Sequence, residues 1–323
     1  MHKLGLAITA AVLSMAAAPP PTMAPEAAKE LSAAIDILKT RHMNRDRLDW
    51  AEVEKEAFEA AKSAATPAET YPAIRGIITK LNEKHTFLIP AENEKARQTG
   101  AAVGKTQPPP FIVPEAWPLA DRAMLLRVPA FMGNEAQDRI YVATLRQAVQ
   151  HAADKGICRF VIDLRGNWGG NMFPMLAGLR AFLGKAPYGY WVLPDGKRIA
   201  WKVSDAPVEG ANLPPYAVAA PDLSYVWVAV LQDEATSSAG EFTAMGFRGL
   251  PQARSFGSDT AGYLSSNEPI ALPDGAEIAV SEGWATDRVG HDYRDVLTPD
   301  QATASGQATV DAALAWLKHQ RCR

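Results

Sequence analysis

The chain has little of what common metal or nucleotide sites require. Its 323 residues include two cysteines and six scattered histidines with no HExxH pair, which argues against the usual zinc sites. A glycine-rich loop at 166–170 has neither GxGxxG spacing nor a Walker lysine, so a nucleotide site is not indicated. The net charge of −3 offers no basic field for nucleic acid. The sequence therefore predicts no metal, no organic cofactor and no nucleic-acid partner.

An apolar run near the N-terminus, "LGLAITAAVLSMAAA", is too short for an ordinary membrane span. Positive charge precedes it and small residues and prolines follow, which is the layout of a signal peptide. We expect residues 1–24 to be a signal peptide cut after Ala16, Ala18 or Ala24. The mature protein is then predicted to be periplasmic or secreted, without stable membrane insertion. An uncleaved N-terminal anchor is the alternative. A lipid anchor is not indicated, because the run has no cysteine near it.

The two cysteines, Cys158 and Cys322, leave two interpretations open. An exported protein with an even cysteine count can form a disulfide, here between the C-terminal helix and the core. Alternatively, Cys158 is a small buried hydrophobic residue.

The first part of the mature chain has a helical pattern. Apolar residues recur at helical spacing in three segments between residues 25 and 81. Asp49 is expected to cap the second helix and Thr66 the third, with Pro67 at the first helical position. Residues 25–90 are therefore predicted to form a helical bundle. Residues 91–117 are polar and then proline-rich, and we expect a linker or loop there.

From residue 118 to 323 strand-like and helix-like segments alternate, which predicts a layered α/β domain. The helix over 134–156 is expected to turn Ile140, Leu145 and Val149 inward. The near-continuous apolar run "CRFVIDL" is typical of a strand in the middle of a sheet that is covered on both faces.

The run "ATSSAGEF", residues 235–242, follows a buried strand and raises the question of a nucleophilic serine. A serine hydroxyl needs a neighbouring base, and a histidine such as His85 titrates in the suitable range. A glycine loop after a strand can hold an oxyanion. Each feature also has a plain structural interpretation: a helix cap, a surface histidine and a strand-to-helix turn.

Four segments together carry a family resemblance: "VIDLRGNWGGN", "VLQDEATSSAGEF", "FGSDTAGYLSSNEPIALPDG" and "LTPD". In this order and spacing they resemble the serine peptidase family of C-terminal processing proteases, tricorn proteases and nisin-resistance proteins. The resemblance spans most of the mature chain. It implies an α/β fold with a crotonase-like (ClpP-like) ββα core and an N-terminal helical-bundle cap. The family pattern Ser-Ala-x-Glu places the nucleophile at Ser238.

The resemblance also indicates which base is used. C-terminal processing proteases carry a lysine after a Thr-x-Gly, but here Tyr263 follows Gly262. The tricorn and nisin-resistance branches use a histidine in an element like Glu83–Phe87. The stretch between this element and the next strand is too short for a PDZ domain. The resemblance therefore implies a pair of Ser238 and His85.

Further site residues follow from the same resemblance. The oxyanion donors are expected to be the N–H of Ala239 and that of Gly169 or Gly170. Possible supporting residues are Ser237, Glu241 and Asp292. Asp163 and Arg165 are expected to form a structural ion pair.

The sequence thus predicts an exported serine peptidase that cleaves peptides or unfolded protein tails through an acyl-enzyme. The alternative is an inactive member that binds a peptide or a lipophile, as retinoid-binding relatives of the superfamily do. An esterase is disfavoured because the GxSxG elbow is absent.

Overall fold

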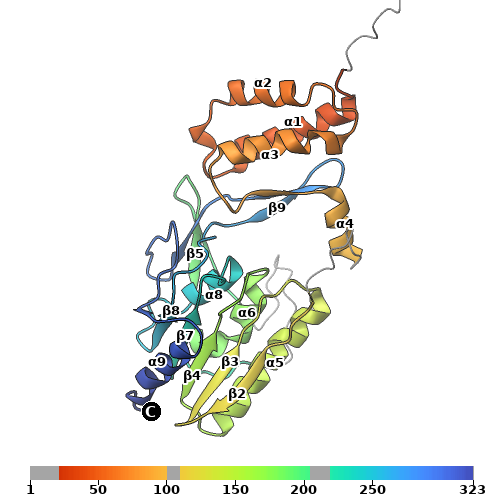
Figure 1. Ribbon diagram of the computed structural model, residues 1–323. Coiled ribbons are helices and arrows are strands. Elements are labelled where there is room, and N and C mark those ends of the chain that lie inside the picture. Colours follow the sequence, from red (N-terminus) through yellow and green to blue (C-terminus); the bar gives the residue numbers. More distant parts are fainter. Residues whose placement is uncertain (1–21, 100–109, 204–218, 323) are drawn as a thin grey trace, which may run out of the picture.

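The computed structural model describes residues 22–99, 110–203 and 219–322 (Figure 1). The expected signal peptide lies almost entirely outside the described residues. Among the helices that are described, none has the length and apolar character needed to cross a membrane. A helical unit stands at one end of the molecule and a larger α/β body at the other.

A six-stranded mixed sheet forms the centre of the α/β body, in the order β12-β8-β7-β4-β3-β2. Its strands are β2 (Glu115–Leu119), β3 (Ala123–Arg127), β4 (Arg159–Asp163), β7 (Trp227–Gln232), β8 (Ala253–Gly257) and β12 (Gln301–Ala302). All neighbours run parallel except β2, which is antiparallel to β3. The apolar run around residue 161 is β4 in the middle of this sheet, as predicted.

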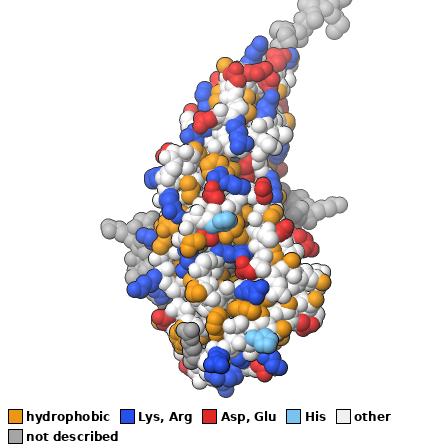
Figure 2. Space-filling model, turned by 90° about the vertical axis from the view of Figure 1, so that its left-hand side faces the viewer, with side chains coloured by type: hydrophobic (Ala, Val, Ile, Leu, Met, Phe, Trp, Pro, Cys, Tyr) orange, Lys and Arg blue, Asp and Glu red, His pale blue; other side chains and the backbone are white. Residues whose placement is uncertain are grey.

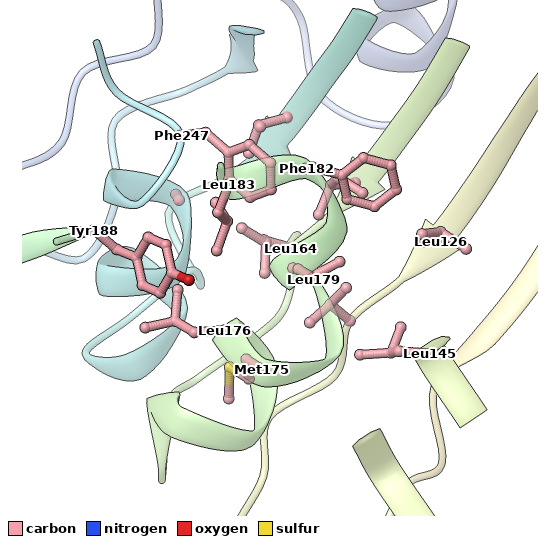
Figure 3. Packing of buried hydrophobic residues seen from close by; sticks show 14 of the residues in the cluster. Leu126, Leu145, Leu164, Met175, Leu176, Leu179, Phe182, Leu183, Tyr188 and Phe247 are labelled. Atoms are coloured by element: carbon pink, nitrogen blue, oxygen red, sulfur yellow. The ribbon is translucent and has the colours of Figure 1, made fainter. Parts of the chain in front are cut away.

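Helices cover both faces of the sheet. Those on one face are α5 (Glu135–Asp154), α6 (Met172–Gly178), α7 (Arg180–Leu183) and α8 (Ala239–Met245). Figure 3 shows their side chains packed with those of the strands. The other face is covered by α9 (Gln307–Lys318) through Val310, Ala313 and Leu317. Alternate residues of β4 and β7 enter the two cores, because successive side chains of a strand point to opposite faces.

The prediction that Ile140 of α5 points inward is wrong. Ile140 is 50% exposed, whereas Tyr141 and Val142 are buried beside Leu145 and Val149. The buried face of α5 therefore includes Tyr141 and Val142 but not Ile140. All three residues have large apolar side chains, so the sequence pattern does not show which of them is buried.

The helical unit contains three α-helices. They are α1 (Pro25–Arg41), α2 (Trp50–Ala60) and α3 (Tyr71–Lys80), with the 3₁₀ turns η1 (Arg45–Arg47) and η2 (Pro67–Thr70). The predicted cap is confirmed, since Asp49 accepts hydrogen bonds from two backbone N–H groups of α2. Thr66 and Pro67 begin the 3₁₀ turn rather than α3, and the Thr66 side chain makes no capping bond.

The helices rest on a small antiparallel sheet that the sequence did not predict. Its order is β1-β10-β9, with β1 at Phe87–Ile89, β9 at Glu268–Ala271 and β10 at Glu277–Val280. Ile278 and Val280 lie in the core beneath the helices. The β9–β10 hairpin therefore supplies part of the core of the helical unit, which residues 25–90 do not form by themselves.

The expected linker over 91–117 differs from the structure. Residues Ala91–Thr99 form α4, and β2 begins at Glu115. The segment "AENEKARQT" is rich in strong helix formers although it lacks an apolar stripe. Residues 100–109 lie outside the described part of the chain.

A hairpin forms from β5 (Gly189–Val192) and β6 (Arg198–Ala200), and β5 also pairs with β11 (Trp284–Asp287). Of the two interpretations of the cysteines, the structure has the disulfide. It joins Cys158 at the start of β4 to Cys322 after α9.

A buried carboxyl group links α1 to the β9–β10 turn. Glu30 is fully buried, and its Oε2 accepts a hydrogen bond from the backbone N–H of Asp274 at 3.1 Å. Tyr71 donates its hydroxyl to the Asp274 carboxylate at 2.5 Å. The pKa of Glu30 is raised to about 7, first by burial and second by the neighbouring Asp274 carboxylate, against the lowering effect of the Asp274 N–H.

This raised pKa predicts a pH-dependent stability. Below pH 4.5, the ordinary pKa of the group, the stabilising effect of the protonated Glu30 is fully present, and it is lost as pH rises through about 7. Glu30→Gln retains a neutral hydrogen-bonding group and should unfold at a higher denaturant concentration than the wild type above pH 7. The expected gain is roughly 1–3 kcal/mol. Denaturant titrations between pH 5 and pH 8 measure it.

Glu26→Gln, an exposed change on the same helix, serves as the control and should leave the pH profile unaltered. Parallel profiles for the wild type and Glu30→Gln would contradict the assignment.

Candidate active site

Ser238 lies in a tight turn between β7 and α8. Its φ of 49° and ψ of −116° are unusual for a residue with a side chain. The Glu241 carboxylate holds this turn, since it accepts the backbone N–H of Ser238 at 2.7 Å. The same carboxylate accepts the N–H groups of Gly262 and Tyr263 at 2.7 and 2.8 Å and the Thr260 hydroxyl at 2.5 Å. Burial raises the pKa of Glu241, and these four hydrogen bonds act in the opposite direction.

His85 lies just before β1 and reaches Ser238 from the helical unit. Its Nε2 is 3.0 Å from Ser238 Oγ, and its Nδ1 is 3.0 Å from the carbonyl oxygen of Ser265. A carbonyl oxygen only accepts, so we assign the imidazole proton to Nδ1. The lone pair of Nε2 then faces the Ser238 hydroxyl, which is the arrangement of a base beside a nucleophile.

The His85 ring is 6% exposed, and this burial lowers its pKa below the ordinary value. The Glu83 carboxylate and the hydrogen bond to Ser265 act in the opposite direction and raise it. A lowered pKa keeps the imidazole neutral near pH 7, as a proton acceptor must be.

The sequence reasoning did not identify Glu83 and Ser265 as parts of the site. Ser265 Oγ donates to Glu83 Oε1 at 3.0 Å and lies 3.3 Å from His85 Nδ1. Glu83 also accepts the N–H groups of His85 and Thr86, at 2.9 and 2.8 Å, and the Ser281 hydroxyl at 2.8 Å. Ser265 Oγ thus lies between the Glu83 carboxylate and the His85 ring. The position of Glu83 two residues before His85 was the only signal in the sequence.

The glycine loop lies directly against Ser238. A Cβ on Gly169 would lie 3.0 Å from Ser238 Cβ. The Gly169 N–H already donates to Asn167 Oδ1 at 3.0 Å. Within the described residues, no hydrogen bond is recorded for the N–H of Gly170 or of Ala239. Of the expected oxyanion donors, these two N–H groups remain available.

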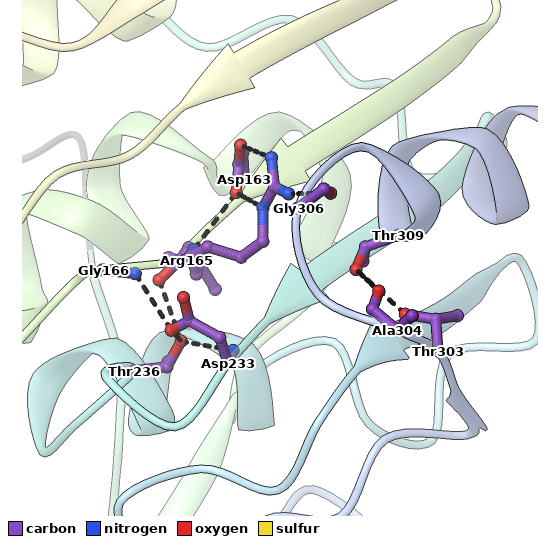
Figure 4. Close-up of polar contacts among 10 residues, drawn as sticks. Asp163, Arg165, Gly166, Asp233, Thr236, Thr303, Ala304, Gly306 and Thr309 are labelled. Carbon is purple, nitrogen blue, oxygen red and sulfur yellow. Dashed lines mark hydrogen bonds and ion pairs between the residues drawn. The ribbon is translucent and has the colours of Figure 1, made fainter.

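Hydrogen bonds tie the glycine loop to the serine loop. Ser237 donates its N–H to the carbonyl of Asn167 at 2.9 Å. Gly166 donates its N–H to Asp233, and the Thr236 hydroxyl donates to the carbonyl of Leu164, both at 3.0 Å (Figure 4).

The predicted ion pair of Asp163 and Arg165 is confirmed at 2.7 Å. Arg165 also donates to the carbonyl of Gly306 at 2.6 Å (Figure 4). The pair therefore joins the end of β4 to the start of α9, which is a structural position.

Two of the expected supporting residues are not placed to support His85. Asp292 forms an exposed ion pair with Arg294 at 2.5 Å, and no contact joins it to His85 within the described residues. The residue that begins α8 is Ser238, not Ser237.

A cavity of about 1290 Å³ opens beside Ser238 and His85. Its walls come from the helical unit, the glycine loop and the β5–β6 hairpin, and include Phe87, Met132, Trp168, Trp191, Phe242 and Tyr263. Its volume exceeds the roughly 300–1,000 Å³ of ordinary small-molecule pockets.

Residues 123–303 match the model of peptidase family S41. The chain belongs to this family. The predicted family is thereby confirmed, together with a mixed α/β fold around a central mixed sheet. Membership of S41 supports a serine peptidase function for the chain.

Individual relatives agree with the S41 assignment. The nisin-resistance protein of Lactococcus lactis subsp. lactis is 27% identical over 276 residues, which cover 85% of this chain and 82% of that protein. A lipoprotein from Streptococcus agalactiae has a similar structure, with a TM-score of 0.75, 23% identity and coverage of 95% and 99% of the two chains. The photosystem II D1 C-terminal processing protease shares the fold at a TM-score of 0.59 and 15% identity, over 87% and 93% of the chains.

The glycine loop yields a stability prediction. Gly170 has a φ of +99°, and a Cβ there would lie 2.0 Å from the carbonyl oxygen of Phe131. Gly170→Ala should therefore displace the loop and lower the free energy of unfolding by roughly 3 kcal/mol or more. Gly166 has a similar φ of +72° but open space around it, so Gly166→Ala should cost only about 1–2 kcal/mol of strain.

Denaturant unfolding of both variants measures the difference, and Trp168 provides a local fluorescence signal beside the loop. Equal losses in the two variants would show that the close approach to Phe131 does not constrain the loop.

Proposed function

We propose that this S41 member is an exported serine peptidase that cleaves peptides or unfolded protein tails through a Ser–His acyl-enzyme mechanism. The observation that carries the proposal is the 3.0 Å approach of His85 Nε2 to Ser238 Oγ, with Nδ1 held by a carbonyl oxygen. The hydrogen-bonded carbonyl orients the ring so that only Nε2 can accept the serine proton.

The proposed reaction has two stages. His85 Nε2 takes the proton of Ser238 Oγ as Oγ attacks the scissile carbonyl carbon. The oxyanion that forms is bound by the N–H groups of Ala239 and Gly170. The imidazolium then gives its proton to the leaving amine, the C–N bond breaks, and the acyl group stays on Ser238. Water, deprotonated by His85, releases the acyl group and restores the serine.

Glu83 and Ser265 are proposed as positioning residues. When His85 takes the serine proton it becomes a positively charged imidazolium. The nearby Glu83 carboxylate, linked to the ring by Ser265, stabilises this positive charge. Ser265 connects the carboxylate to the ring, because its hydroxyl lies between the His85 ring and Glu83.

Export is part of the same proposal. The N-terminal apolar run and the disulfide suit an oxidising compartment. Two relatives are named a lipoprotein and a nisin-resistance protein, which agrees with a protein of the cell envelope or beyond. The crotonase-like core within residues 118–323 and the cap from residue 25 to 90, extended by the β9–β10 hairpin, remain our interpretation of the domains.

Ser238→Ala and His85→Ala should each abolish peptide cleavage while the protein stays folded. Loss of the nucleophile or of the base removes the covalent step, and a decrease in kcat/KM of at least about 1000-fold is expected. Purified mature protein would be incubated with a mixed peptide library, and the products would be identified by mass spectrometry.

Ser237→Ala is the matched control, one residue away in the same loop, and should retain activity. Cleavage at the wild-type rate by Ser238→Ala would exclude the proposed nucleophile. Peptides retained but never cleaved by the wild type would favour the peptide-binding alternative.

Glu83→Gln and Ser265→Ala should lower kcat roughly 10- to 100-fold, less than loss of the base itself. The Glu83 carboxylate raises the pKa of His85, so its removal should also move the acidic limb of the kcat/KM profile to lower pH. Rates measured between pH 4 and pH 9 test both effects.

Ser281→Ala serves as the control. Ser281 also donates to Glu83 but has no contact with the His85 ring in the described part of the chain. An unchanged acidic limb in Glu83→Gln would remove Glu83 from the mechanism.

A further inference from the structure

The end of the central sheet opposite Ser238 carries a cluster of cations. Parallel strands β3, β4, β7 and β8 begin at this end, whereas Ser238 follows the carboxyl end of β7. We call this surface the basic end. Its cations are Arg122, Lys155, Arg159, Arg254, Lys318 and Arg321.

Hydrogen bonds bring these residues together from separate parts of the chain. Arg159 donates to the carbonyl oxygens of Asp121 and Gln320, at 2.5 and 2.7 Å. Arg122 donates to the carbonyl of Gly156 at 2.8 Å. The Cys158–Cys322 disulfide joins the same two segments, which places Arg321 beside the start of β4. These bonds and the disulfide therefore hold Arg122, Arg159 and Arg321 together at one end of the sheet.

The six cations have no carboxylate partner among the described residues. Arg122 and Arg159 donate to backbone carbonyls only, and no ion pair is found for any member of the cluster. Carboxylates are present nearby, but Asp154 accepts from Gln150 and Asp222 from Ser224. Asp121 lies at the same end, so the six cations outnumber these three carboxylates on a chain whose net charge is −3.

On the face drawn in Figure 2, Lys and Arg side chains are mixed with Asp and Glu over the whole height, and several Lys and Arg side chains gather at the lower end. The C-terminus and α9 lie at this end of the molecule (Figure 1).

Aromatic side chains accompany the cations. Tyr225, which precedes β7, is 52% exposed. Trp227 donates its indole N–H to the carbonyl of Arg321 at 2.9 Å and packs edge-on against Trp316, with 5.9 Å between ring centroids. Tyrosine and tryptophan have an apolar ring and a polar tip, and they favour the headgroup region of a bilayer.

We propose that the basic end docks the protein on an anionic phospholipid surface. Unpaired lysines and arginines near such a surface each add a modest, salt-sensitive attraction, and several together give reversible binding without insertion. Docking through the amino ends of the strands leaves the cavity beside Ser238 facing away from the lipid. The inference does not depend on the catalytic roles proposed for Ser238 and His85.

Vesicle co-sedimentation tests the proposal. The full mature protein would be mixed with vesicles of phosphatidylcholine alone or of phosphatidylcholine with phosphatidylglycerol. We expect binding to the anionic vesicles only, lost as the salt concentration rises. Lys155→Glu, Lys318→Glu and Arg321→Glu combined should weaken that binding at least tenfold and leave the unfolding midpoint unchanged.

The matched control changes the same net charge elsewhere, through Lys29→Glu, Lys55→Glu and Lys197→Glu, all exposed. It should retain binding within about threefold, since surface charges beyond a Debye length are screened. The proposal is overturned if the wild type ignores anionic vesicles, binds neutral ones equally, or loses binding equally in the control. Binding to a soluble anionic polymer but not to vesicles would also overturn it.

Discussion

The parallel pairing of β4 with β7 is the constraint on which the site depends. Parallel neighbours end at the same edge of a sheet, so the loop after β4 and the loop after β7 emerge side by side. Main-chain hydrogen bonds between these loops then set the glycine residues against Ser238. A register shift of one residue would move Gly170 and Ser238 apart and would exchange the two faces of the shifted strand.

Two buried or half-buried carboxylates hold the reacting groups in position. Glu241 gathers main-chain N–H groups around the Ser238 turn, and Glu83 does the same around His85. The cost of removing each carboxylate from water is offset by these hydrogen bonds. His85 and Ser238 are 153 residues apart in sequence, so the two turns must be rigid for the side chains to meet at hydrogen-bond distance.

The helical unit owes its position to the β9–β10 hairpin. The hairpin leaves the α/β body after β8, pairs with β1 and presents Ile278 and Val280 to the helices. Since β1 begins two residues after His85, the same pairing that anchors the helices also brings the His85 ring to Ser238. Fold and site are therefore built by one set of long-range strand contacts.

The sequence by itself determined the local elements and indicated the candidate reacting groups. Apolar periodicity and turn residues indicated β4, β7, the first three helices and the Asp49 cap, because these depend on neighbours a few residues away. The Ser-Ala-x-Glu pattern indicated Ser238, and the element around His85 indicated the base.

Only the tertiary structure decided what surrounds them. It places Glu83, and not Asp292, next to His85 by way of Ser265. In the described residues it gives the N–H of Gly169 a partner in Asn167 and the N–H of Gly170 none. It also chose the disulfide of Cys158 and Cys322 over a buried thiol. These outcomes depend on which segments pair at long range and in which register, and single-sequence periodicity carries no information about either.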